Sequence, residues 1–165
     1  MNKVINKTAT ATTGEPVTEQ APAVDTTSTT PAPGLPDGYL ADGFLETASI
    51  GKPFLRAVYV GTFAQQIATV LQPMSASAFQ AAFLRDTKKH LRRDVPYEAQ
   101  AACAAALLPQ AIKLTAKRKA PPVLVDIITV AVSAVRDTTT FEALYKHLDA
   151  IYAFMLQAQQ KGDDT

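Results

Sequence analysis

The sequence predicts an all-α protein, a compact bundle of about five helices that follows a disordered N-terminal tail. Two observations support this fold class. Apolar residues recur at steps of three to four over most of residues 53–155, which is the period of an amphipathic helix. Prolines and capping residues divide this pattern into pieces of ordinary helix length. We therefore expect the bundle over residues 35–160 and a short disordered C-terminal tail over residues 161–165.

Residues 1–34 differ in composition from the rest of the chain. They hold nine Thr and four Pro but no Leu, Phe, Tyr or Trp. A segment with so little apolar surface to bury does not offset the entropy that ordering costs, so we expect a disordered tail. A turn follows at residues 35–39, where Pro36 presets φ and Gly38 supplies a permissive position.

The first two helices are predicted over residues 53–93. Pro53 stands in the first turn of the first helix, which ends at residues 72–73. Its apolar stripe consists of Leu55, Tyr59, Phe63, Ile67 and Val70. Ser75 or Ser77 caps the second helix, which runs to about Arg93.

The third helix is Ala-rich and spans residues 97–119. Pro96 stands at its start, and Pro109 lies within the pattern, where it should kink or split the helix. Pro121 and Pro122 end it.

Residues 123–136 are apolar on nearly all sides, and their β-branched content would also suit a buried strand. We predict a helix, because a lone strand would have no partner in this chain, and we place it at the centre of the bundle. Thr139 and Glu142 have the spacing of a capping box for the last helix. Its predicted core positions are Phe141, Leu144, Tyr145, Leu148, Ile151, Tyr152 and Met155.

The composition argues against several classes of function. A single cysteine, Cys103, excludes a disulfide framework and a cysteine zinc site, and two distant histidines, His90 and His147, argue against a histidine site. No apolar run has the length of a membrane span, and no apolar segment of a signal peptide follows the first lysines. We expect a cytoplasmic protein with no metal and no cofactor.

Catalytic motifs are also absent from the sequence. The seven glycines are scattered and form no phosphate-binding loop. His147 and Asp149 are two residues apart on a helix and do not face each other. Cys103 lies among alanines, which is typical of a small buried hydrophobe. We predict that the protein is not an enzyme.

The placement of charged residues along the chain is the sequence feature that points to a function. Residues 85–119 hold nine of the sixteen Lys and Arg but only three of the fifteen acids, a net charge of +6, and the remainder of the chain has −5. The candidate RNA-binding residues are Arg85, Lys88, Lys89, Arg92, Arg93, Lys113, Lys117, Arg118 and Lys119.

The first five of these cations lie opposite the apolar face of the second predicted helix. Like charges one turn apart destabilise a helix unless a partner compensates, so an anionic ligand explains them better than a merely solvated face. The last four either extend the same patch or simply complement the dipole at a helix C-terminus. No aromatic residues alternate with the cations for base stacking, which favours contact with a nucleic-acid backbone. Membrane binding is not expected, because the apolar face belongs to the core.

Three segments resemble a known family. The closing helix, with Phe141 and the run Leu-Asp-Ala-Ile-Tyr-Ala-Phe over residues 148–154, resembles that of the small subunit of type III-A (Csm-type) CRISPR interference complexes. Residues 107–117, Leu-Leu-Pro-Gln-Ala-Ile-Lys-Leu-Thr-Ala-Lys, are similar to a second family motif, and Pro-Asp-Gly-Tyr at residues 36–39 to its opening. The resemblance covers about residues 36–156.

This resemblance implies a small helical bundle without catalytic activity. Copies of it would stack into an inner filament beside the repeated backbone subunits and the large subunit, and would contact the backbone of the guide RNA and target RNA. Two alternatives remain from the sequence: a helical protein–protein adaptor, and a DNA-binding regulator of the helix-turn-helix kind.

Overall fold

A computed structural model describes residues 34–46 and 52–163 of the chain. The elements are β1 (Leu45–Glu46), β2 (Phe54–Leu55), α1 (Ala57–Val60), α2 (Thr62–Val70), α3 (Ala76–Phe79), the π-helical turn η1 (Gln80–Leu84), α4 (Arg85–Lys89), α5 (Tyr97–Ala116), α6 (Val123–Ser133) and α7 (Thr138–Asp163). The described helices form five segments, because α1 and α2 are interrupted only at Gly61 and α3, η1 and α4 are continuous. The all-α fold class is confirmed. The predicted disorder of residues 1–33 lies outside the described residues.

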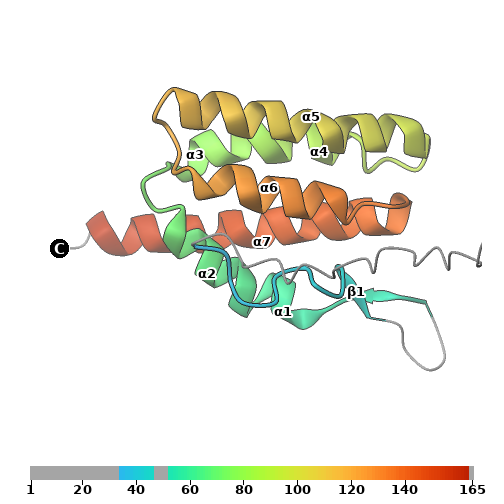
Figure 1. Cartoon of the computed structure of the whole chain (residues 1–165), viewed down its shortest axis with the longest axis horizontal. Helices are drawn as coiled ribbons and strands as arrows, with labels where there is room; N and C mark the ends of the chain where they lie inside the picture. The colour runs from blue at the N-terminus through green and yellow to red at the C-terminus, as the bar shows by residue number, and fades with distance from the viewer. Residues whose placement is uncertain (1–33, 47–51, 164–165) are drawn as a thin grey trace, which may run out of the picture.

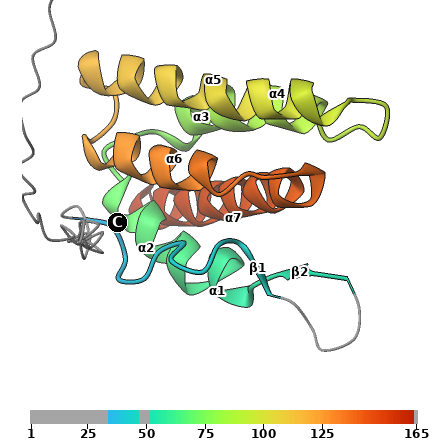
Figure 2. The same ribbon diagram turned by 45° about the vertical axis from the view of Figure 1, so that its right-hand side comes forward.

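The segments stack in three layers (Figure 1). One outer layer holds α3, α4 and α5, the middle layer holds α6 and α7, and the other outer layer holds α1, α2 and residues 34–46 (Figure 2). Residues 90–96 connect α4 to α5, and this short connection places α5 antiparallel to the α3–α4 segment.

α7 shares the middle layer with α6 and packs against more of the other elements, so the fourth helix is not the sole central element that the sequence predicted. α7 packs against α1, α2, α3, η1 and α5, whereas α6 packs mainly against α5. The helical state of residues 123–133 is confirmed, but only one face of α6 is buried, through Leu124, Ile127, Ile128 and Ala131. Its valines are half-buried, so apolar residues on every side of the helix did not mean full burial on every side.

Residues 53–56 do not begin the first helix, contrary to the sequence prediction. β2 occupies part of this segment and pairs antiparallel with β1. The backbone N–H of Arg56 then donates to the carbonyl oxygen of Phe44 (3.1 Å). These contacts satisfy backbone groups that a first helical turn leaves without partners, and the helix begins at Ala57 instead.

The capping box of α7 lies two residues earlier than predicted. The backbone N–H of Thr140 donates to Oδ1 of Asp137 (2.8 Å), and the N–H of Asp137 donates to Oγ1 of Thr140 (2.9 Å). The reciprocal pair is therefore Asp137 and Thr140, not Thr139 and Glu142. Glu142 forms an ion pair with Lys146 one turn later (2.8 Å).

Three further boundaries differ from the predicted ones. α5 ends at Ala116 and continues unbroken through Pro109, whose exposed position lets the solvent take up the missing hydrogen bond. α6 ends at Ser133 rather than Arg136. α7 continues to Asp163, past the predicted end of the bundle at residue 160.

Candidate nucleic-acid interface

The segment α3–η1–α4 carries the first group of predicted cations. Ser75 caps its start by accepting a backbone hydrogen bond from the first turn (3.3 Å). The hydroxyl of Thr87, which is fully buried, donates to the carbonyl oxygen of Phe83, so this polar group is satisfied inside the core. The buried face consists of Ala76, Phe79, Phe83, Leu84 and Thr87. The opposite face is left to the solvent.

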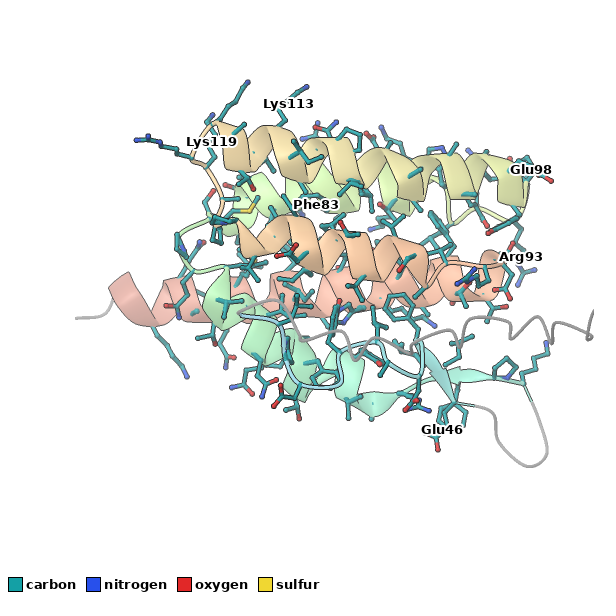
Figure 3. All side chains as sticks on the ribbon, viewed as in Figure 1. Glu46, Phe83, Arg93, Glu98, Lys113 and Lys119 are labelled. Atoms are coloured by element: carbon teal, nitrogen blue, oxygen red, sulfur yellow. The ribbon has the colours of Figure 1, made fainter. Side chains whose placement is uncertain are left out.

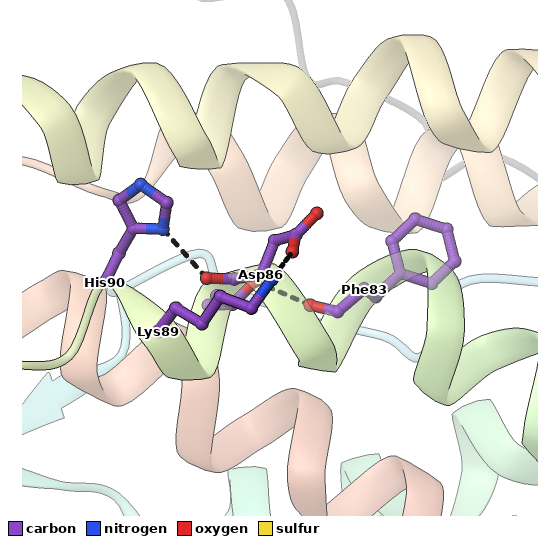
Figure 4. Close-up of polar contacts among 5 residues, drawn as sticks. Phe83, Asp86, Lys89 and His90 are labelled. Carbon is purple, nitrogen blue, oxygen red and sulfur yellow. Dashed lines mark hydrogen bonds and ion pairs between the residues drawn. The ribbon is translucent and has the colours of Figure 1, made fainter.

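α4 ends four residues before Arg93, the predicted end of the second helix. Nδ1 of His90 lies 2.8 Å from the carbonyl oxygen of Asp86, so the ring satisfies a carbonyl at the end of the helix (Figure 4). Gln100 of α5 donates from Nε2 to the carbonyl oxygen of His90 (3.0 Å), which holds the connection against α5. Arg92 and Arg93 therefore lie in the connection and not on the helix.

The five cations of this region are all exposed, and together we call them the basic edge: Arg85, Lys88, Lys89, Arg92 and Arg93. Two of them form ion pairs, Lys89 with Asp86 (2.9 Å) and Arg92 with Asp94 (3.0 Å). Among the described residues, the other three have no carboxylate within 4.0 Å. The hydrogen bond and positive charge of Lys89 lower the pKa of Asp86, which keeps that carboxylate ionised.

The other four predicted cations surround the C-terminus of α5 and are also exposed: Lys113, Lys117, Arg118 and Lys119. We call them the α5 cluster. Arg118 adopts a positive φ of 54°, and the N–H groups of Arg118 and Lys119 donate to the carbonyl oxygens of Thr115 and Leu114 (both 2.9 Å). This is a Schellman motif, so the backbone of the cluster is fixed by the helix end.

The two groups do not form one continuous patch. Lys113 and Lys119 lie at one end of the outer layer, and Arg93 lies at the other (Figure 3). α5 separates them, and a helix of 20 residues is roughly 30 Å long. The structure thus presents two separate basic sites on the same layer.

The exposed face of α5 between these sites is largely apolar. The side chain of Ile112 is 51% exposed. The other uncharged exposed residues of the helix are Ala102, Ala105, Ala106, Pro109, Gln110 and Ala116. This face carries one amide, one acid (Glu98) and one lysine (Lys113), and no arginine.

Two side chains with nucleophilic or acid–base chemistry, Cys103 and His147, are shielded from the solvent. Cys103 is 8% exposed, and burial raises the pKa of its thiol. His147 is fully buried. In the part of the chain that the structure describes, no three His, Cys, Asp or Glu side chains lie close enough to hold a metal ion. No helix in that part is long and apolar enough to cross a membrane.

His147 is a structural residue that the sequence prediction overlooked. Its ring is surrounded by Tyr39, Phe44 and Tyr59, with ring centroids 5.6–5.8 Å from its own. It lies on the same face of α7 as Leu144 and Leu148, which is the one sequence signal of its burial. The cluster joins Tyr39, Phe44 and helix α1 to α7.

Comparisons with known proteins give no family. No protein-family model matches the chain, and no curated protein or solved structure is significantly similar to it.

Proposed function

We propose that this protein is a non-catalytic, cytoplasmic subunit of a type III-A CRISPR ribonucleoprotein that binds the backbone of guide or target RNA. The observation that carries the proposal is the basic edge, where five exposed cations are gathered over nine residues. The resemblance of residues 36–156 to the small-subunit family supplies the type of complex. Its partners would be the repeated backbone subunits, the large subunit and further copies of the same chain.

The chemistry of the edge favours phosphate over base recognition. Residues 85–96 contain no Phe, Tyr or Trp for stacking on a base. The ring nitrogen Nδ1 of His90 is engaged by a backbone carbonyl and is not free to contact a base. The Arg and Lys side chains of the edge can contact phosphate oxygens, and such contacts position a nucleic-acid backbone without reading its sequence.

Salt dependence of RNA binding tests this proposal. In the triple variant Arg85→Gln/Lys88→Gln/Arg93→Gln, three exposed cations without a carboxylate partner among the described residues are neutralised. The logarithm of the affinity for a labelled oligouridylate should then fall less steeply with the logarithm of salt, by about two units of slope over ~50–300 mM salt.

The matched control is Lys52→Gln/Lys146→Gln/Lys161→Gln, which removes the same charge from exposed positions elsewhere. The control should keep most of the wild-type slope. Equal affinity of the wild-type and basic-edge variant at every salt concentration would contradict the proposal, as would a wild-type chain that does not bind RNA.

A protein–protein adaptor is the second candidate, and the exposed apolar face of α5 favours it. Small side chains such as Ala105 and Ala106 let another backbone approach closely, and Ile112 offers a large apolar side chain. An adaptor should bind neither RNA nor DNA at ~50 mM salt, which separates it from the first proposal. No specific observation favours the regulator alternative, and the exposed α5 face has no arginine to read base edges.

A further inference from the structure

We propose that Asp86 and Asp94 act as intramolecular competitors of the RNA backbone at the basic edge. This inference rests on the proposed function and divides the edge into two classes of cation. Arg85, Lys88 and Arg93 are available to an incoming phosphate. Lys89 and Arg92 must first leave a carboxylate of their own chain.

The Lys89–Asp86 pair occupies the outer surface of α4. Nζ of Lys89 donates to Oδ1 of Asp86 at 2.9 Å, a spacing of three residues on one helix face (Figure 4). The two side chains are 67% and 69% exposed, so a polyanion has direct access to both. A phosphate that approaches Lys89 therefore meets the negative charge of Asp86 at the same place.

In the Arg92–Asp94 pair, the carboxylate is bound by the Nε–Nη2 edge of the guanidinium group. Nε of Arg92 donates to Oδ1 of Asp94 (3.1 Å) and Nη2 donates to Oδ2 (3.0 Å). A phosphate binds arginine through the same pair of parallel N–H donors. The carboxylate of Asp94 and an RNA phosphate thus exclude each other on this edge of Arg92.

Both ion pairs are exposed to the solvent, and this exposure determines how much the two acids reduce the affinity for RNA. Exposed ion pairs contribute little, so an RNA phosphate displaces the carboxylate at a modest loss of affinity, about two- to fivefold for each pair. The acids reduce the strength of the edge without abolishing binding. Their removal should tighten binding and make it more dependent on salt.

The first experiment compares three Asp→Asn variants of the full chain by fluorescence anisotropy with a labelled oligouridylate. Asp86→Asn and Asp94→Asn should each bind about two- to fivefold more tightly than wild type. Asp149→Asn is the control, because it changes the net charge equally from an exposed position on α7. If all three variants tighten binding equally, general charge explains the effect and the competitor role is wrong.

A double-mutant cycle provides the second test. Lys88→Gln should weaken binding more than Lys89→Gln, because only Lys89 is held by a carboxylate in the free protein. In the Asp86→Asn background, Lys89→Gln should cost as much as Lys88→Gln. Circular dichroism of each variant checks that α4 remains helical.

The outcomes separate the two proposals. A wild-type chain that does not bind RNA contradicts the proposed function itself. A wild-type chain that binds RNA, combined with equal losses for Lys88→Gln and Lys89→Gln in both backgrounds, leaves the proposed function standing and overturns the competitor role.

Discussion

Tyr39 and His147 are 108 residues apart in sequence and are joined by a buried hydrogen bond of 2.8 Å. Nδ1 of His147 bonds to the carbonyl oxygen of Tyr59, which only accepts, so Nδ1 carries the proton. Nε2 is then the acceptor, and the hydroxyl of Tyr39 donates to it. Burial lowers the pKa of His147 from 6.5 to about 4 and raises the pKa of Tyr39, so both side chains are neutral in the folded protein.

This geometry predicts a loss of stability in mild acid. Between about pH 6.5 and pH 4 the unfolded chain binds a proton at His147 and the folded chain does not. The free energy of unfolding should fall by about 3 kcal/mol across this window through this residue, and no further below it. Above the window the full contribution is present.

Urea unfolding of wild type and His147→Gln at several pH values measures this effect. The variant should be less stable near pH 7, since it disturbs two buried hydrogen bonds, but the difference from wild type should shrink towards pH 4. His90→Gln, at a half-exposed position, serves as the control. A difference between wild type and His147→Gln that stays constant with pH would contradict the assignment.

The cap of α7 gives a second prediction. Asp137→Ala removes the side-chain acceptor of the first turn and should lower the free energy of unfolding by about 1 kcal/mol. Thr139→Ala, at the exposed position favoured by the sequence pattern, should change it by less than about 0.5 kcal/mol. Urea midpoints of the two variants decide between the two caps.

The end of α5 predicts a stabilising substitution. Arg118 adopts a left-handed backbone conformation. This conformation costs free energy for a residue with a Cβ atom but not for glycine. Arg118→Gly should raise the free energy of unfolding by up to about 1 kcal/mol. Lys117→Gly is the matched control, because Lys117 has a negative φ of −83° and should gain nothing. Thermal unfolding of both variants is the measurement.

The central position of α7 predicts a contrast along one helix. Leu144→Ala should cost about 2–5 kcal/mol, because Leu144 is fully buried and its truncation leaves a cavity. Leu156→Ala, the same substitution at a side chain that is 37% exposed, should cost far less. Similar losses in chemical denaturation would show that α7 is not the core element.

The sequence pattern predicted the helices well where burial follows local periodicity, as in α6 and α7. The pattern failed where a contact between residues far apart in the sequence determines where a helix begins. The first helix begins late because residues before Ala57 pair with β1 and Phe44, which no local pattern reveals. Apolar content alone favoured α6 as the central helix, although α7 packs against more of the other elements.

The exposure of the predicted cations followed correctly from the position of the apolar residues. The arrangement of these cations in space did not follow from the sequence pattern, for two reasons. α4 ends at Lys89, where the ring of His90 contacts the carbonyl oxygen of Asp86, so Arg92 and Arg93 lie beyond the helix. The antiparallel pairing with α5 carries Lys113 away from Arg93, and the short connection at residues 90–96 was the sequence signal of that pairing.

The outer layer of residues 34–46, α1 and α2 is joined to α7 by residues that lie far apart along the chain, and this affects the order of folding. Closing a loop of 108 residues costs about 4 kcal/mol of chain entropy before any contact repays it. The hairpin of α5 and α6 closes over a few residues and carries no such cost. We expect α5 and α6 to pair early and the layer containing Tyr39 to dock late. Tyr39→Phe should therefore speed unfolding and leave the folding rate almost unchanged.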